Sequence, residues 1–203
     1  MLNDLPPFPV ESFFGAATKI KKRVGRLTYL PDTSGWTHEE AFARIAITWS
    51  DGGLAVYVQV KKPLEEVQFP HFRDGDSVEL MFDTRDLKSA LSVHQFCHHF
   101  VFYPEEMEGI QAQEITRFRS DDAHERADSA FFGVETTVSK RSYEMEIQLP
   151  KRVLHGYRPK EFSRLGFAYR INRPSGDPQH FFLSSHSFNV EKHPGLWASL
   201  ELT

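Results

Sequence analysis

Two glutamates with strand spacing are the first candidates for catalytic chemistry in this chain. Glu144 and Glu146 alternate with apolar residues in the segment YEMEIQLP, which would place both carboxylates on one strand face about 7 Å apart. That separation falls within the range of inverting glycosidases. Alternating glutamates are also ordinary on the solvent face of an antiparallel strand. We therefore favour an exposed strand face and expect no enzyme activity, with a glycoside hydrolase as the less favoured alternative.

Histidines are the second candidates, since the chain has 10 of them. His94, His98 and His99 lie close together, and His71 lies upstream. On a strand, His94 and His98 would share a face but stand about 13 Å apart, too far for two ligands of one tetrahedral metal ion. His98 could pair instead with a histidine of another strand. We favour hydrogen-bonded or exposed histidines and predict no metal site.

Carboxylates in turns are the third candidates. Asp74, Asp76, Asp83 and Asp86 flank one predicted strand and could collect a calcium ion, but they lack the order of an EF-hand loop, and Asp-Gly turns need no ion. We predict no cofactor and keep a structural calcium ion as the alternative. The single cysteine, Cys97, has apolar neighbours and is predicted to be a buried thiol rather than a nucleophile.

The element that must position these side chains is the stretch FRDGDSVELMFDTRD, residues 72–86. Three apolar residues alternate with Glu79, Met81 and Asp83, the period of a strand with one face in a core. Asp-Gly and Asp-Thr turn sequences bound it on both sides. The stretch is therefore a half-buried strand whose non-core face carries Glu79 and Asp83.

The rest of the chain has the same strand-and-turn organisation. The clearest hairpin joins two alternating runs through Asp51-Gly52-Gly53. Short strands punctuated by turns, with hardly a helix, predict an all-β, antiparallel β-sandwich of jelly-roll type with roughly ten strands and at most one or two short helices. Strands are predicted at 18–30, 43–50, 54–60, 78–83, 95–103, 109–118, 132–138, 143–149, 165–172, 181–184 and 196–202, helical turns at 38–42 and 150–155, and a loop or short helix at 120–128.

Length and charge limit the function classes. The chain has 203 residues, which fits one domain over 1–203, with residues 1–14 as an extended proline-containing arm. A net charge of -4 argues against nucleic acid as a partner, and the basic run at 19–26 is read as a lysine-protected edge strand. The sequence begins without a signal peptide and has no run long enough to span a membrane. We expect no membrane partner and, by default, a cytoplasmic location.

Three segments in order resemble the family 9 carbohydrate-binding modules and the wider DOMON-like superfamily. They are WSDGGLAVYVQVKKP (49–63), DSVELMFD (76–83) and the region from YEMEIQLP to LGFAYRIN (143–172), and PGLWASLEL (194–202) matches the closing strand. The resemblance implies a noncatalytic β-sandwich that binds a sugar between aromatic platforms, often with structural calcium. It places hydroxyl-binding groups on Glu79, Arg170 and Asn172.

The chain departs from the family at the platforms and at one strand. Where the family has tryptophans, this chain offers Phe72 before the central strand, and Phe188 or His186 before the last one. The segment that usually carries a sugar-contacting arginine is FCHH, residues 96–99. Phenylalanine still stacks on a sugar ring, with less area and no polar edge.

These observations lead to one favoured hypothesis and one alternative. The favoured hypothesis is a noncatalytic saccharide-binding domain whose concave sheet face carries the ligand site. Phe72 and Phe188 would supply apolar contact, Glu79, Arg170 and Asn172 hydrogen bonds, and His98 would lie at the edge of the site. The alternative is a stand-alone protein-interaction or structural domain of the same fold that has lost the sugar site, with a protein partner that the sequence does not identify.

Overall fold

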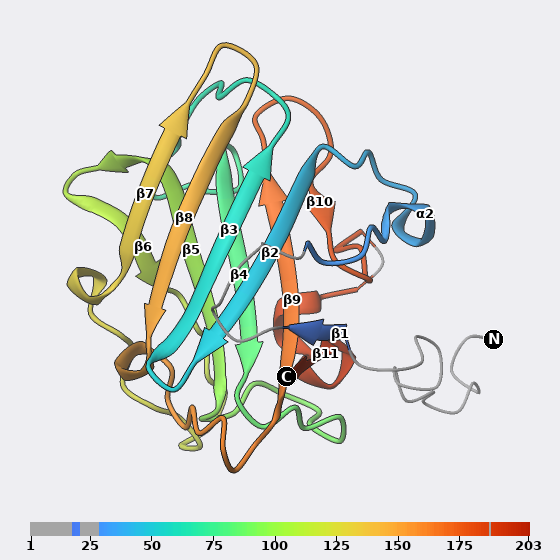
Figure 1. Ribbon diagram of the computed structural model, residues 1–203, viewed down its shortest axis with the longest axis vertical. Coiled ribbons are helices and arrows are strands. Elements are labelled where there is room, and N and C mark those ends of the chain that lie inside the picture. The colour runs from blue at the N-terminus through green and yellow to red at the C-terminus, as the bar shows by residue number, and fades with distance from the viewer. Residues whose placement is uncertain (1–17, 21–28, 187) are drawn as a thin grey trace.

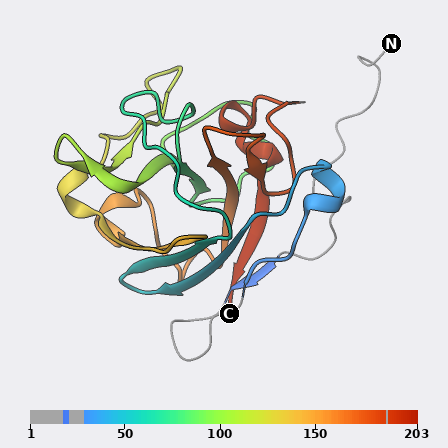
Figure 2. The same cartoon turned by 90° about the horizontal axis from the view of Figure 1, so that it is seen from above.

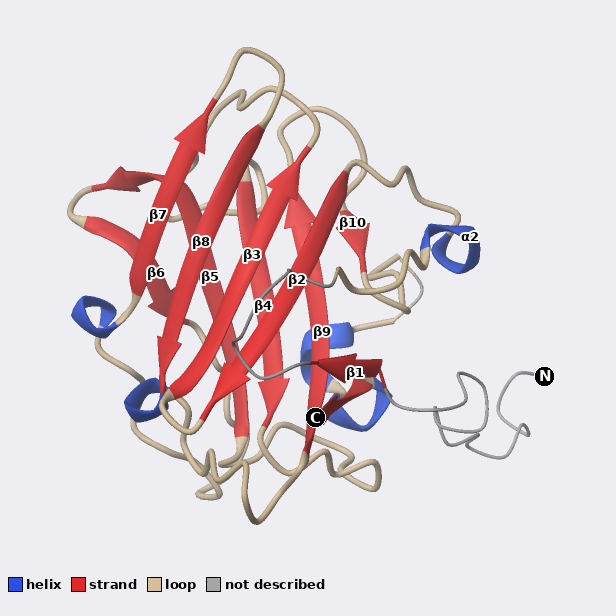
Figure 3. Cartoon of the chain, viewed as in Figure 1, coloured by secondary structure: helices blue, strands red, loops and turns tan. Residues whose placement is uncertain are grey.

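The computed structural model describes residues 18–20, 29–186 and 188–203, and it shows two β-sheets packed face to face (Figures 1 and 3). All strand pairs are antiparallel except β1 with β11. The predicted antiparallel β-sandwich with roughly ten strands is therefore confirmed. The large sheet has the order β1 (Thr18–Ile20), β11 (Ala198–Leu202), β9 (Arg164–Asn172), β4 (Ser77–Asp83), β5 (Cys97–Met107) and β6 (Ile110–Glu114), with β10 (Gln179–His180) also paired to β9. The small sheet has the order β2 (Ala43–Ser50), β3 (Gly53–Val60), β8 (Tyr143–Pro150) and β7 (Gly133–Val138).

Helix is confined, in the described residues, to one α-helical turn and four 3₁₀ turns. These are α2 (Ser34–Thr37), η1 (Ser129–Phe131), η2 (Lys151–Val153), η3 (Val190–Lys192) and η4 (Pro194–Leu196). No helix among the described residues is long and apolar enough to cross a bilayer. The described part of the chain is thus built almost entirely from strands and loops.

The main core lies between the two sheets and follows the period-2 pattern of the strands. Val78, Leu80 and Phe82 of β4 face it, as do Val56 and Val58 of β3. The β2–β3 hairpin turns at Asp51 and Gly52, as its sequence predicts. Residue 53 must be glycine, because its φ is +139° and a Cβ atom there would lie 2.1 Å from the Leu149 carbonyl oxygen.

A buried glutamine ties the two sheets together at one end of the sandwich. The Gln179 Oε1 atom accepts hydrogen bonds from the backbone N–H groups of Phe42 and Ala43 at 2.8 and 2.7 Å. Its Nε2 group donates to the Ala43 carbonyl and to the Tyr169 hydroxyl at 3.0 and 3.1 Å. All four hydrogen-bonding positions of this buried amide are therefore occupied, as burial requires.

Several predicted boundaries are wrong. The helical turn predicted at 38–42 lies at Ser34–Thr37, because His38 has a φ of +58° and ends the helix. No strand covers 181–184, since Phe182 has a φ of +66° and breaks the extended backbone after β10. Strand β5 is longer and β6 shorter than predicted, and 120–128 contains no helix. The predicted arm at 1–14 and most of the basic run lie outside the described residues.

The outer face of the large sheet, which points away from the small sheet, is covered rather than exposed. Figure 2 shows the turns η3 and η4 lying over this face. Glu79, Met81 and Asp83, predicted for a face outside the core, are all buried there. A second apolar cluster fills the space under the turns and contains Met81, Val93, Cys97, Ala168, Val190 and Trp197. The outer face therefore carries its own small core, and the polar residues beside it are fixed in place.

Candidate functional site

Glu79 lies at the centre of a buried polar network on the outer face of the large sheet. Its side chain is 0% exposed. The strand register places Arg170 of β9 directly opposite Glu79, and Asn172 opposite Ser77. On the other side of β4, Met81 is paired with His99 of β5. Three residues that the sequence assigned to one site, Glu79, Arg170 and Asn172, therefore lie together.

Both carboxylate oxygens of Glu79 accept hydrogen bonds from three different side chains. Arg73 donates from Nε to Oε1 at 3.0 Å and from Nη2 to Oε2 at 2.8 Å. The Nε2 group of His99 donates to Oε2 at 2.8 Å, and Nδ2 of Asn172 donates to Oε1 at 2.9 Å. Two-bonded arginine–carboxylate contacts are among the strongest polar contacts in proteins. Glu79 thus fixes the positions of Arg73, His99 and Asn172.

The ionised state of Glu79 follows from these partners. Burial by itself would raise the pKa of the Glu79 carboxyl, but the hydrogen bonds and charges of His99 and Arg73 outweigh it and hold the pKa well below its usual range. Burial lowers the pKa of the Arg170 guanidinium, and its positive neighbour Arg73 adds to that effect while Glu79 opposes it. The network therefore contains an ionised carboxylate surrounded by cationic and amide donors.

A folded loop delivers Arg73 to Glu79. The Oδ2 atom of Asp76 accepts hydrogen bonds from the backbone N–H groups of Glu65 and Glu66 at 2.8 and 3.1 Å. A Cβ atom on Gly75 would lie 2.6 Å from the Gln68 backbone nitrogen, so the chain can fold this tightly only with glycine there. The loop between β3 and β4 is therefore closed on itself, with Arg73 on its inner side.

A cleft of about 550 Å³ opens beside this network. Two aromatic residues from different loops line it: Phe72 precedes β4, and Phe118 follows β6. The other lining residues are mostly polar or charged: Pro70, His71, Arg73, Asp74, His99, Ile115, Arg117, Arg119, Glu191 and Lys192. Glu191 also lies 3.5 Å from Nη1 of Arg73. The cleft thus combines two apolar ring faces with polar groups that Glu79 holds in place.

The six predicted site residues are not all part of this arrangement. Phe72 lines the cleft, and Glu79 lies beneath its wall residues Arg73 and His99. Arg170 and Asn172 belong to the network but do not line the cleft. Phe188 is 47% exposed, in the segment that leads to Glu191.

The predicted position of His98 at the edge of the site is wrong. His98 is paired with Phe82 of β4, so its side chain points toward the inside of the sandwich. Its ring is 0% exposed and lies beside Glu114. Strand alternation in the sequence predicts that His98 and His99 point to opposite faces of the sheet. It does not predict which of the two side chains points toward the outer face.

Sequence reasoning missed Arg73, His99 and Phe118 as site residues. Arg73 and Phe118 lie in loops, where strand periodicity carries no information. His99 was a candidate only as a metal ligand, although it occupies the strand segment in which the resembling family has a sugar-contacting arginine. That correspondence was the available signal, but the segment FCHH contains both His98 and His99 and does not choose between them.

The remaining chemical candidates lie elsewhere. Glu144 and Glu146 are on β8 of the small sheet, where Glu144 accepts a hydrogen bond from Gln59 at 2.9 Å. Among the described residues, the turn aspartates form no group of three whose ligand atoms lie close together. The Asp83 carboxylate instead accepts hydrogen bonds from the backbone N–H groups of Arg85 and Leu87.

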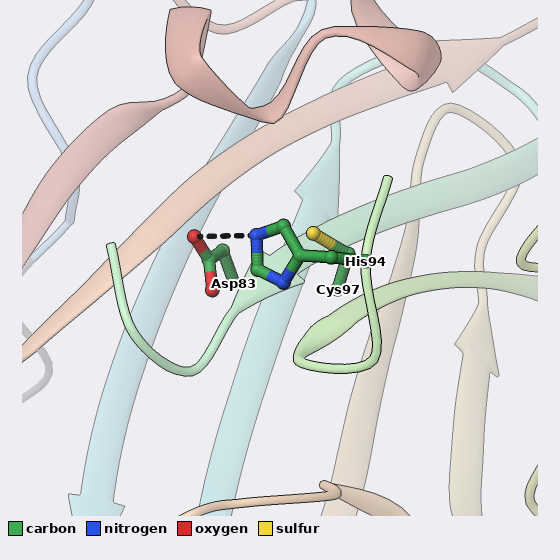
Figure 4. A group of neighbouring side chains, drawn as sticks. All are labelled: Asp83, His94 and Cys97. Carbon is green, nitrogen blue, oxygen red and sulfur yellow. Dashed lines mark ion pairs between the residues drawn. The ribbon is translucent and has the colours of Figure 1, made fainter. Parts of the chain in front are cut away.

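Asp83 does approach a histidine and the cysteine. The imidazole of His94 points toward the Asp83 carboxylate, with Nε2 and Oδ2 3.6 Å apart (Figure 4). Cys97, from the neighbouring strand, completes a group whose ligand atoms all lie within 4.8 Å of one another. Burial raises the pKa of the Cys97 thiol strongly, which confirms the prediction of a buried, inert thiol.

The two packed antiparallel sheets form a β-sandwich of the kind found in family 9 carbohydrate-binding modules. No family model and no curated protein matches the chain. Two solved structures of a family 9 carbohydrate-binding module from Caldicellulosiruptor kristjanssonii, in complex with cellotriose and with glucose, superpose with a TM-score of 0.63. Their sequence identities are 17% and 15%, over 92% and 91% of this chain and 93% and 94% of theirs. A Bacteroides uniformis protein with a proposed carbohydrate-binding role superposes with a TM-score of 0.52 at 9% identity, over 92% of this chain and 97% of its own.

These similarities establish the fold. They agree with the resemblance to family 9 carbohydrate-binding modules, while the wider DOMON-like relationship stays a prediction.

Proposed function

We propose that this protein is a noncatalytic saccharide-binding domain whose ligand site is the cleft on the outer face of the large sheet. One observation carries the proposal. Glu79 holds Arg73 and His99 rigidly at the wall of a cleft that also presents Phe72 and Phe118. The structural neighbours described as modules in complex with cellotriose and glucose support the same class of ligand.

The chemistry of the cleft suits a sugar ring. A pyranose has an apolar face that can stack on an aromatic ring, and its hydroxyl groups need donors and acceptors at fixed positions. Arg73 and His99 are already held by Glu79, so binding would cost little side-chain entropy. Phe72 and Phe118 are the stacking candidates because they line the same cleft from separate loops.

Arg170 extends the polar part of the site beyond the cleft. Its Nε group donates to Oδ1 of Asn172 at 2.7 Å and lies 3.7 Å from Oε1 of Glu79. The guanidinium has two further nitrogens that can donate to ligand hydroxyls. Asn172 in turn donates to Glu79 and to the Ser77 hydroxyl, which fixes the position of Arg170.

The ionised state of Glu79 argues against this residue as the general acid of a glycosidase. A glycosidase needs a carboxylic acid with a raised pKa that can protonate the leaving oxygen. Glu79 is held in the ionised form by three donors, so it has no proton to give near neutral pH. It therefore serves as an anchor for the groups around it.

A thermal-shift screen of the purified protein tests this function. Neutral oligosaccharides and uronate-containing ones are both included, because Arg117, Arg119 and Lys192 line the cleft. A ligand that binds only the folded state raises the midpoint by mass action, so even weak binding is visible at high concentration. A rise with one class of saccharide is expected. No rise with any saccharide would favour the interaction-domain alternative.

A further inference from the structure

A second polar cluster, distinct from the cleft network, is buried on the core side of the large sheet. It consists of His98 in β5, Glu114 at the end of β6 and His124 in the loop between β6 and β7. The side chains of His98 and Glu114 are 0% exposed, and that of His124 is 4% exposed. Charged or ionisable groups this deeply buried must be compensated by close partners.

The three side chains converge on one carboxylate oxygen. Oε1 of Glu114 lies 3.0 Å from Nδ1 of His98 and 2.9 Å from Nε2 of His124. The two imidazole rings are 4.4 Å apart between centroids. The candidate ligand atoms of all three residues lie within 4.8 Å of one another.

The outward-pointing nitrogen of each ring faces a backbone carbonyl. Nδ1 of His124 lies 2.6 Å from the Gln95 carbonyl oxygen, and Nε2 of His98 lies 3.4 Å from the His155 carbonyl oxygen. A neutral imidazole with its proton on the outer nitrogen can donate that proton to the carbonyl, and this contact is the shorter one at His124. Metal-ligating histidines almost always show this pattern, because the outer N–H orients the ring and leaves the inner lone pair for the metal.

The number of N–H groups on the His124 ring also favours a bound metal ion. A neutral imidazole has a single N–H, yet both nitrogens of His124 face oxygen acceptors. One proton on His124 cannot serve both the Gln95 carbonyl at Nδ1 and the Glu114 carboxylate at Nε2, whereas a metal ion bound at Nε2 leaves the proton on Nδ1 for the carbonyl.

We propose that His98 Nδ1, His124 Nε2 and Glu114 Oε1 bind one divalent transition-metal ion of the zinc class. Two imidazoles and one carboxylate are a known zinc ligand set, with a fourth position left for another ligand. Ligands of tetrahedral zinc, each about 2.0–2.1 Å from the ion, lie about 3.3 Å apart. The observed contacts of 3.0 and 2.9 Å need to open by only a few tenths of an ångström. Imidazole ligands favour zinc over the hard ions magnesium and calcium.

The other histidine cluster lacks this arrangement. The backbone N–H of Phe96 donates to Nδ1 of His94 at 3.3 Å, so the proton of that ring lies on Nε2, which points at Asp83. A metal at Nε2 would move the proton to Nδ1, where it would meet the Phe96 donor. Because His94 lacks a free lone pair directed at its neighbours, we assign the metal to His98, Glu114 and His124 rather than to the group around His94.

The proposed ion would fix a wall of the cleft. Oε2 of Glu114 accepts the Ala127 backbone N–H at 2.8 Å, and its Oε1 accepts the Thr116 hydroxyl at 2.6 Å. The chain between these anchors carries cleft-lining residues, including Phe118, whose ring packs edge-on against His124 at 4.9 Å between centroids. Metal binding would therefore stabilise the loop that presents Phe118.

Metal titration of the chelator-stripped, untagged protein tests the proposal. Zn²⁺ and Co²⁺ are expected to raise the thermal midpoint, each binding at one ion per chain, whereas Mg²⁺ and Ca²⁺ leave the midpoint unchanged. Bound Co²⁺ is expected to show the visible absorption of a four-coordinate site. No midpoint shift with Zn²⁺ together with no Co²⁺ absorption would overturn the proposal, whatever the outcome of the saccharide screen.

Matched variants locate the site. His124→Gln is expected to lose the Zn²⁺-dependent shift and the Co²⁺ absorption, while His186→Gln, at an exposed histidine, keeps both. If both variants keep the Zn²⁺-dependent midpoint shift and the Co²⁺ absorption, the assignment is overturned. Should His124→Gln fail to fold, nitrogen NMR of the histidine rings in the wild-type protein decides: shifts on adding Zn²⁺ must fall on His98 and His124, and shifts confined to other histidines would contradict the proposal.

Discussion

Arg73 and Glu79 lie six residues apart in the chain and form a two-bonded ion pair, with Nε–Oε1 and Nη2–Oε2 distances of 3.0 and 2.8 Å. The Glu79 side chain is fully buried, whereas Arg73 is 36% exposed at the wall of the cleft. A buried carboxylate therefore holds a guanidinium that can still reach a ligand. The pair links the stability of the outer face to the geometry of the proposed site.

Glu79→Gln should destabilise the protein. The substitution removes the charge that compensates Arg73 and His99, and leaves a buried amide whose NH₂ group faces donors. We expect a loss of about 2–3 kcal/mol in the free energy of unfolding, below the full cost of breaking a buried pair because Arg73 can turn toward water. Urea unfolding of the variant and the wild-type protein measures this loss of unfolding free energy. Glu146→Gln on the exposed face of β8 is the matched control, expected to change stability by less than about 0.5 kcal/mol, and equal losses in the two variants would contradict the account.

The same carboxylate should make stability depend on acid pH. The pKa of Glu79 is lower in the folded protein than in the unfolded chain, so its contribution is complete above the unfolded pKa of about 4.3 and is lost as the pH falls toward the folded value. The wild-type protein should lose more unfolding free energy between about pH 6 and about pH 3 than Glu79→Gln does. Urea unfolding across this range compares the two, and parallel curves would show that Glu79 is not the titrating group.

Phe72→Ala should weaken saccharide binding. Phe72 lines the cleft, and removal of an aromatic stacking surface is expected to raise the dissociation constant about tenfold. Calorimetric titration with the saccharide found in the screen measures the dissociation constant. The control is Phe131→Ala, which removes an exposed ring of η1 that packs on Arg152 of η2. Similar affinities in Phe72→Ala and the wild-type protein would remove Phe72 from the site.

Arg170→Ala should reduce affinity with little effect on folding. The substitution removes a donor group but leaves Asn172 bonded to Glu79 and Ser77. We expect at least a tenfold rise in the dissociation constant and a nearly unchanged thermal midpoint. Arg141→Ala, in the exposed β7–β8 turn, is the control. A large fall in the midpoint with unaltered affinity would make Arg170 a structural residue only.

The sequence predicted most of the fold because strand periodicity and turn chemistry are local properties. The Asp51-Gly52 hairpin and the alternation of Val78, Leu80 and Phe82 both appear as predicted. At two of the boundaries that the prediction missed, a residue with a positive φ marks the end of the element. The positive φ values of His38 and Phe182 end a helix and a strand at positions that composition did not reveal.

Within the buried network, the sequence predicted only those site residues that strand alternation places on one face of the sheet. Glu79, Arg170 and Asn172 share a face because β4 and β9 pair in register. Arg73 joins them through a loop closed by Asp76 and Gly75, a long-range arrangement with no periodic signature. His98 and His124 meet at Glu114 across β5, β6 and the following loop. The sequence suggested a pairing of His98 with a histidine of another strand but did not indicate His124 or Glu114.

Chemical-shift mapping of the isotope-labelled protein during titration with the bound saccharide tests the central claim most directly. The account predicts that the largest shifts fall on Phe72, His99 and Phe118 and on the side-chain N–H signals of Arg73. The outward face of the small sheet, including Glu144 and Glu146, should stay unchanged. Shifts concentrated on the small sheet, with the cleft residues unaffected, would contradict the account.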